Sequence, residues 1–244
     1  TSTNPTFEGA VRDTSGRGND GMIHGGVSYN AAEKAFSFDG TDDMIDIPIP
    51  RDMLGDPEAT VSIWVNPTSI TTTSGNWDMF AHVGRNVSNQ QFQLTYEGST
   101  KFHLGGYGQN LRITGDYPLM NGVWYHLCAV VKPGPWSTTN KKLYINGQQI
   151  TNTYSENLNS GITNIGNHVR SRISFGALRG EGNAIDHEAN CKMSNMKVYN
   201  AALTTEEVKT LYDMGRCDEG GHMVNFSKTR VGIGLGDGAL GDGA

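Results

Sequence analysis

Residues 35–50 of this 244-residue chain, AFSFDGTDDMIDIPIP, determine how the fold begins. Apolar and polar residues alternate in two short runs, at 36–38 and at 45–49. This period of two is typical of a β-strand that has one face in a protein core. Residues 39–43, DGTDD, supply the Asp and Gly that a tight reversal needs. The stretch therefore predicts a β-hairpin.

Outward from this stretch, the chain continues as short runs of alternating hydrophobicity that end at Gly, Asn or Pro. Such a pattern predicts many antiparallel strands joined by turns. Residues 123–132 form the longest apolar run, for which we expect a central position, and Asn146-Gly147 indicates a two-residue hairpin turn. The predicted strands lie within 59–66, 77–83, 90–96, 100–104, 109–114, 123–132, 141–150, 173–178 and 191–200, of which those from 77 to 114 form a meander.

One segment, residues 204–214, has the pattern of a helix. Thr204 and Glu207 are spaced as a capping box at its start, and Gly215 follows its end. We therefore expect one short helix near the C-terminus of an otherwise all-β chain.

Composition excludes several classes of function. The formal net charge is -6 and no dense Lys/Arg cluster occurs, which argues against nucleic acid as a partner. No apolar run approaches the roughly 20 residues that span a bilayer, so we expect no membrane insertion. The three cysteines are too few for a disulfide framework. Cys128 is expected to be a buried thiol. The sequence leaves open whether Cys191 and Cys217 form a disulfide.

Seven phrases follow one another along the chain: DTSGRGNDG at 13–21, FDGTDD at 38–43, TVSIWV at 60–65, WYHLCAVV at 124–131, LYING at 143–147, KMSNMKVYN at 192–200 and ALTTEEV at 202–208. In wording and order they resemble the laminin-G-like branch of the concanavalin A-like lectins and glucanases. The resemblance covers more than four-fifths of the chain. It implies an all-β, antiparallel jelly-roll β-sandwich over residues 1–220, with one short C-terminal helix and a Gly-rich extended tail at 221–244.

The same resemblance implies a structural Ca²⁺ ion, held by Asp/Asn side chains and loop carbonyls. Asn19, Asp20 and Asp39 are the candidate ligands. Two observations favour an alternative in which these side chains cap turns. Side chains of this type commonly do so, and residues 194–195 are Ser-Asn where the family commonly has an acidic pair.

The tail is unlike the rest of the chain. Residues 223–244 are Gly-rich and contain LGDGA twice, with too few apolar residues to form a core alone. The phrase RVGIG at 230–234 resembles segments of trimeric phage and large-virus tail fibres and spikes. That resemblance implies a homotrimer formed through 223–244, a virion-surface or extracellular location, and a cleaved chaperone domain beyond Ala244. A flexible linker is the alternative.

Polar residues out of phase with the core in the middle strands are the candidates for a binding site. On one sheet face they would form a groove whose planar rings stack on sugars and whose amide and guanidinium groups bind hydroxyls or carboxylates. For His126 we favour packing, because it belongs to a family strand phrase. The candidate carbohydrate-binding residues are His82, Gln91, Gln93, His103, Tyr107, Arg112 and His126.

Three functions remain open from the sequence. The first is recognition of a host cell-surface or cell-wall polysaccharide as a module of a viral or phage fibre. The second is cleavage of that polysaccharide by lyase or glycoside hydrolase chemistry, with His103, Tyr107 and Arg112 as catalytic candidates. The third is a structural or protein-binding spacer.

Overall fold

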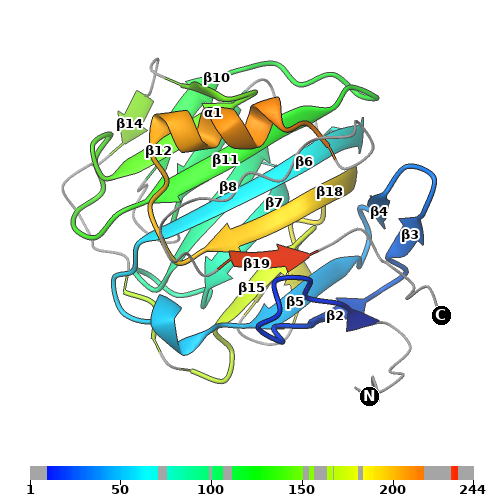
Figure 1. Ribbon diagram of the computed structural model, residues 1–244, viewed down its shortest axis with the longest axis horizontal. Coiled ribbons are helices and arrows are strands. Elements are labelled where there is room, and N and C mark those ends of the chain that lie inside the picture. Colours follow the sequence, from blue (N-terminus) through cyan, green and yellow to red (C-terminus); the bar gives the residue numbers. More distant parts are fainter. Residues whose placement is uncertain are drawn as a thin grey trace.

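Two antiparallel β-sheets lie face to face and form a jelly-roll sandwich, with one helix across the outer side of one sheet (Figure 1). In this computed structural model the described residues are 10–70, 76–98, 101–106, 112–150, 154–156, 164–166, 168–180, 184–216 and 232–235. The side chains of residues 10, 112, 154–156 and 232–235 are not among the described parts.

The larger sheet, called sheet A, has nine strands and contains the predicted meander as four consecutive neighbours, β7 to β10. The meander prediction is thus confirmed. In order across the sheet the strands are β1 (Ala10–Val11), β2 (Gly21–His24), β5 (Met44–Pro48), β15 (Arg172–Phe175), β7 (Trp77–Gly84), β8 (Gln91–Glu97), β9 (Lys101–Gly105), β10 (Arg112–Asp116) and β14 (Tyr154–Glu156).

The second sheet, called sheet B, has eight strands and places the long apolar strand β11 between two neighbours, as predicted. Outside the main path of this sheet, β19 (Gly232–Leu235) pairs with β18. The main path is β13 (Gln148–Gln149), β12 (Lys141–Ile145), β11 (Tyr125–Val131), β6 (Ala59–Ser69), β18 (Asn190–Tyr199), β4 (Ala35–Asp39) and β3 (Ser28–Asn30). A separate two-stranded hairpin joins β16 (Leu178–Arg179) and β17 (Ile185–Asp186), and a 3₁₀ turn spans Arg51–Met53.

The hairpin predicted for residues 35–50 is wrong. Its strands β4 and β5 do not pair with each other, because β4 belongs to sheet B and β5 to sheet A. Residues 40–43 therefore form a corner between the sheets. Asp43 stabilises this corner, since its carboxylate accepts hydrogen bonds from the backbone N–H groups of Asp39 and Gly26. The apolar side chains of both strands enter the same core from opposite sides.

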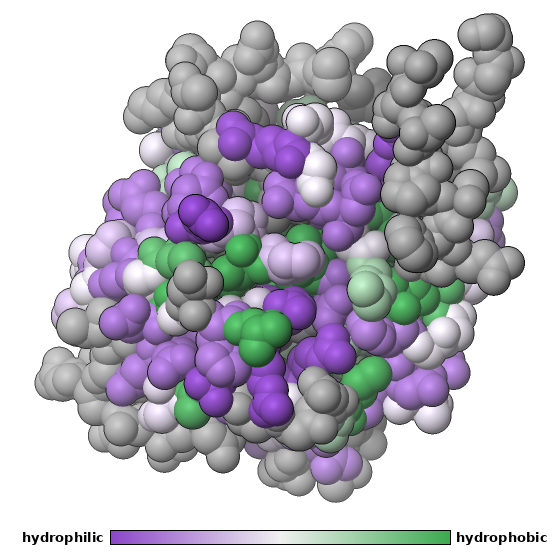
Figure 2. All heavy atoms as spheres, turned by 90° about the horizontal axis from the view of Figure 1, so that it is seen from below, coloured by the Kyte–Doolittle hydropathy of each residue, from purple (hydrophilic) through white to green (hydrophobic). Residues whose placement is uncertain are grey.

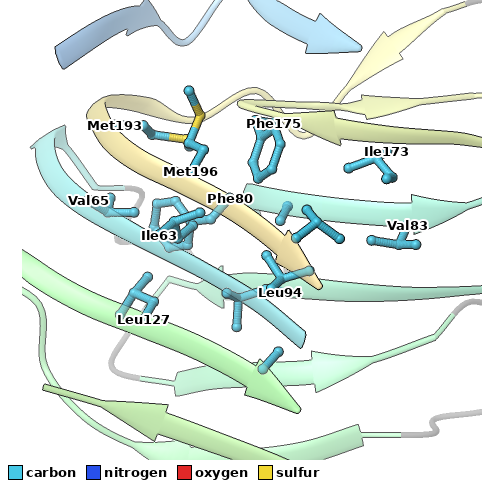
Figure 3. Close-up of a cluster of buried hydrophobic side chains, with 14 of the residues drawn as sticks. Ile63, Val65, Phe80, Val83, Leu94, Leu127, Ile173, Phe175, Met193 and Met196 are labelled. Carbon is cyan, nitrogen blue, oxygen red and sulfur yellow. The ribbon is translucent and has the colours of Figure 1, made fainter. Parts of the chain in front are cut away.

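The core fills the space between the two sheets with alternate side chains of their strands. Figure 3 shows Ile63 and Leu127 of sheet B facing Phe80 and Leu94 of sheet A. All four of these side chains are almost completely buried. Burial raises the pKa of the Cys128 thiol, which confirms the expected buried cysteine, and Cys191 is also a buried free thiol. Cys217 lies outside the described residues.

Helix α1 (Thr205–Asp213) begins and ends as its sequence predicts. The Thr204 side chain accepts a hydrogen bond from the Glu207 N–H, and the Glu207 side chain accepts one from the Thr204 N–H. Val208 and Leu211 pack on the outer face of sheet B. Gly215 adopts φ +69°, a left-handed conformation suited to glycine after a helix.

The surface is mainly polar where Figure 2 shows it, with small separate apolar patches between hydrophilic residues. In the described ranges, no helix has the length and apolar composition that crossing a membrane requires. The predicted division into residues 1–220 and 221–244 falls outside the described residues and stays a prediction.

Candidate functional site

The outer side of sheet A, which faces away from sheet B, gathers polar side chains from four neighbouring strands. Phe92 and Leu94 of β8 belong to the core, so Gln91 and Gln93 between them lie on the opposite side. The register places His82 opposite Gln93, Thr95 opposite His103, and His103 opposite Thr114. We call the set His82, Gln91, Gln93, Thr95, His103 and Thr114 the polar face.

The two glutamines of the polar face orient each other. Gln93 Nε2 donates to Gln91 Oε1 at 2.7 Å, and Gln91 Nε2 donates to Asn86 Oδ1 at 3.0 Å. Gln91 is buried and Gln93 is half-buried. This arrangement leaves the Gln93 amide as the partly exposed end of an oriented chain, which is suitable for contacts with hydroxyl groups.

His82 lies beneath this surface, with 1% of the residue exposed. Burial lowers the pKa of His82 to about 4, and the nearby Gln91 side chain opposes that shift. Neither ring nitrogen of His82 has a hydrogen-bond partner within the described part of the chain. The imidazole is therefore neutral at physiological pH and retains both a donor and an acceptor.

His103 is fixed by three neighbours. Its Nε2 lies 3.1 Å from Glu97 Oε2, and its Nδ1 lies 2.9 Å from Thr114 Oγ1. A carboxylate only accepts, so Nε2 carries a proton, and in the neutral ring Nδ1 accepts from the Thr114 hydroxyl. The Trp77 ring lies 4.7 Å from the imidazole, centroid to centroid. These contacts give His103 one orientation on the polar face.

A basic cluster adjoins the polar face. Asp46 of β5 stands opposite Ser174, which stands opposite His82 in the register. The buried Asp46 carboxylate pairs with Arg179, and its Oδ2 lies 3.7 Å from Arg172 Nε. Two guanidinium groups around one carboxylate leave a net positive charge, and each Arg side chain is about one-quarter exposed.

Arg172 and Arg179 were not predicted as site residues from the sequence, although the alternation pattern contains a signal for Arg172. In β5 and β15 the core residues alternate with Asp46, Arg172 and Ser174, so alternation alone places these three on the outer face. Arg179 carried no such signal, because it belongs to the hairpin after β15.

Two predicted site residues lie wholly or partly outside the described parts of the chain. Tyr107 lies outside the described residues. Arg112 stands opposite Gly105 in the register of β9 and β10, but its side chain is not described. Of the three catalytic candidates, the structure therefore describes the side-chain environment of His103.

His126 does not share the polar face. It belongs to β11 of sheet B, where it stands opposite Trp64 and is fully buried. Its Nε2 lies 2.9 Å from Ser62 Oγ, and its ring contacts Trp64 and Tyr212. The packing that we favoured for His126 is confirmed. Its inclusion in the common groove was wrong, because alternation within a strand does not show which sheet that strand joins.

The predicted calcium ligands Asn19, Asp20 and Asp39 take part in turns, and the calcium site stays a prediction. Asp20 Oδ1 accepts from the Asp13 N–H, and Asn19 donates to Asp13, so this loop forms its own turn. The carboxylates that converge, within 4.8 Å of one another, belong to Asp39, Asp42 and Asp43. Burial raises the pKa of Asp43, and the charges of its two acidic neighbours add to that effect. Such hard oxygen donors suit Ca²⁺.

Two hollows lie away from the polar face. A cavity of about 270 Å³ adjoins the Asp39 corner, and its lining includes Asn190 and Lys192. Another, of about 230 Å³, lies beside the first turn of α1, where Lys132 and Lys142 contribute to its lining.

Comparison with known proteins identifies a family and several similar folds. The family model of the concanavalin A-like lectin/glucanases superfamily matches residues 39–209. The botulinum neurotoxin serotype D binding domain aligns with TM-score 0.57 and 17% identity, over 83% of this chain and 48% of that chain. The serotype D ligand-binding domain in complex with N-acetylneuraminic acid aligns with TM-score 0.59 and 16% identity, over 83% of this chain and 48% of that chain. A Trypanosoma rangeli sialidase in complex with sialic acid aligns with TM-score 0.57 and 15% identity, over 80% of this chain and 30% of that chain.

These likenesses concern the fold, because the sequence identities are low. This chain spans about half the length of the neurotoxin domains that it matches. No curated protein matches the sequence significantly.

Proposed function

We propose that this chain, which belongs to the concanavalin A-like lectin/glucanases superfamily, recognises a polysaccharide through the polar face of sheet A. The observation that carries the proposal is the register of β7, β8 and β9, which brings His82, Gln93 and His103 to one side of one sheet. Sugar hydroxyls both donate and accept hydrogen bonds. The partly exposed Gln93 amide offers both kinds of partner at the surface of the polar face.

The surroundings of the polar face support a sugar ligand. Trp77 is a half-buried aromatic ring beside His103, and aromatic rings stack on the apolar faces of sugars. Arg172 and Arg179 add positive charge at one end, which suits a sugar carboxylate. Two proteins of similar fold form complexes with sialic acids, which are carboxylated sugars.

The finer proposal concerns where the module works. We place it on a viral or phage fibre or spike, at the virion surface or in the extracellular space, as a homotrimer that engages a host polysaccharide. The support is the resemblance of residues 230–234 to fibre segments and the LGDGA repeat in the tail.

Polysaccharide cleavage is a second candidate, favoured by the hydrogen-bonded chain Glu97–His103–Thr114. A carboxylate that holds a histidine in one tautomer is an arrangement found around general bases. On this alternative His103 Nδ1 would accept a proton from the substrate, after the Thr114 hydroxyl has turned away.

Binding is tested with a glycan array, followed by titration calorimetry on any ligand found. Replacing Gln93 with Ala is expected to weaken binding about tenfold or more, because it removes one oriented hydrogen-bonding group. Lys142→Ala is the control, since Lys142 lies on sheet B. Equal losses in both variants, or no glycan bound at all, would overturn the proposal and favour a spacer function.

Cleavage is tested on the same polysaccharides by reducing-end release and by absorbance at 235 nm. If the chain is an enzyme, His103→Gln abolishes product formation while glycan binding persists. Product formation unchanged in that variant would exclude His103 as the base.

A further inference from the structure

The outer edge of β18 is divided into two halves by a bulge. Asn190–Met193 pair with β4, whereas Met196–Tyr199 pair with β19. Between them the register with β6 shifts, and Asn195 adopts φ +49° in the left-handed region. The bulge ends the pairing with β4 and starts a second edge of four residues, which we call the acceptor edge.

The sequence of β19 matches the acceptor edge residue by residue. The register puts Ile233 opposite Val198 and Leu235 opposite Met196, and both of these β18 residues are buried in the core. Gly234 stands opposite Lys197, on the alternate register position. Directly paired residues share a face of a sheet. A strand that alternates glycine with an aliphatic residue therefore suits this edge.

The chain length before β19 exceeds what pairing within one chain requires. The Asn195 side chain donates to the Gly215 carbonyl, so the chain leaves α1 at the Met196 end of the acceptor edge. Antiparallel β19 begins at the other end, opposite Tyr199. Three residue steps of strand separate the two ends by about 10 Å, and the opposite directions of β18 and β19 are visible in Figure 1. The fifteen residues 217–231 can span at most about 50 Å, which also reaches a neighbouring molecule.

We propose that the acceptor edge is a strand-binding site whose occupant in the assembled protein is β19 of a second copy. This inference rests on the self-assembly included in the proposed function, and it names the contact that would hold the copies together. If each copy donates its strand to the next, the contacts are head-to-tail and close into a ring, which is consistent with a trimer. Backbone pairing supplies the affinity and the glycine–aliphatic alternation the specificity.

The test is a disulfide placed across the pair Lys197 and Gly234. Paired antiparallel residues lie about 4.5–5.5 Å apart at Cα, within the range that a disulfide spans. The 244-residue chain carrying Lys197→Cys and Gly234→Cys, with Cys217→Ser, is oxidised and run on a non-reducing gel. Strand exchange predicts covalently linked oligomers, and each single-cysteine variant on the same background is the control.

The other results each contradict the proposal in a different way. A cross-link confined to monomers would show that each tail stays on its own domain, and no cross-link would show that β19 does not occupy the acceptor edge in solution.

Sedimentation of Gly234→Pro separates strand exchange from tail-mediated assembly in general. Proline cannot donate to the strand ladder, so exchange predicts a monomer, whereas Gly241→Pro, outside β19, should assemble like wild type. A Gly234→Pro trimer would overturn the exchange and leave tail-mediated assembly intact. Glycan binding of the monomer, measured on the same array, tests the proposed function independently.

Discussion

His82 and His126 lie in the middle strands of opposite sheets, and both are buried on the outer side of their sheet. His126 is enclosed by Trp64 and Tyr212 and packs beneath the end of α1. His82 lies among amides, one register position from Ser174 and two from Asp46. The helix thus turns the outer face of sheet B into a second small core, whereas the outer face of sheet A keeps polar groups oriented for a ligand.

Acid is expected to destabilise the surroundings of both histidines, and this is the largest effect that we expect. Burial lowers the pKa of His82 to about 4 and that of His126 to about 3, from an ordinary value of 6.5. Below about pH 6.5 the two imidazoles therefore bind protons in the unfolded chain but not in the folded chain. The contribution of these two histidines to the free energy of unfolding is fully present above that pH. It decreases as the pH falls toward their folded-state pKa values. At about 1.4 kcal/mol per pKa unit, the loss is several kcal/mol.

Urea unfolding between pH 4 and pH 8 measures this loss. His82→Gln and His126→Gln should each flatten the pH dependence, with the larger change for His126 because its pKa is lower. A pH dependence identical to wild type in both variants would contradict neutral burial of these rings.

Leu211→Ala should break the covered face alone. Leu211 of α1 is 4% exposed and packs against sheet B, so its truncation is expected to cost about 3 kcal/mol in the free energy of unfolding. Chemical denaturation gives the value. The control is Lys209→Ala, which removes an exposed ion pair with Asp213 and should change stability by less than about 0.5 kcal/mol. Glycan affinity should stay at the wild-type value, and a parallel loss would show that the two faces are coupled.

Calcium should have the smallest effect, at the corner where the chain passes from sheet B to sheet A. The structural Ca²⁺ ion expected from the sequence is tested at this corner, where the carboxylates of Asp39, Asp42 and Asp43 lie within 4.8 Å of one another. At a calcium concentration equal to Kd the stabilisation is about 0.4 kcal/mol. Thermal unfolding with calcium, magnesium or chelator measures it. Asp42→Asn should remove the calcium response, and a response retained there would place the ion elsewhere.

Local features of the sequence predicted local structure well. The capping box of Thr204 and Glu207 is present at the start of α1, and Asn146-Gly147 forms the turn between β12 and β13 with both residues at positive φ. These signals work because the interacting groups are close together in the chain.

The candidate site was predicted in part. His82, Gln91, Gln93 and His103 were correctly placed on one face, because their strands form a meander in which chain order equals sheet order. His126 was misplaced and Arg179 was missed. Each of these two lies beyond a connection that changes sheet or leaves the sheet.

The sequence alone determined which residues of each strand share a face, where the turns fall and where the helix begins. It could not decide that β4 and β5 join different sheets, that His126 lies under α1, or that β19 pairs with the acceptor edge. The period of two is a property of the strand itself, whereas the choice of partner strand depends on which apolar faces meet in the core. That choice compares residues far apart in the chain, so only the tertiary structure decided it.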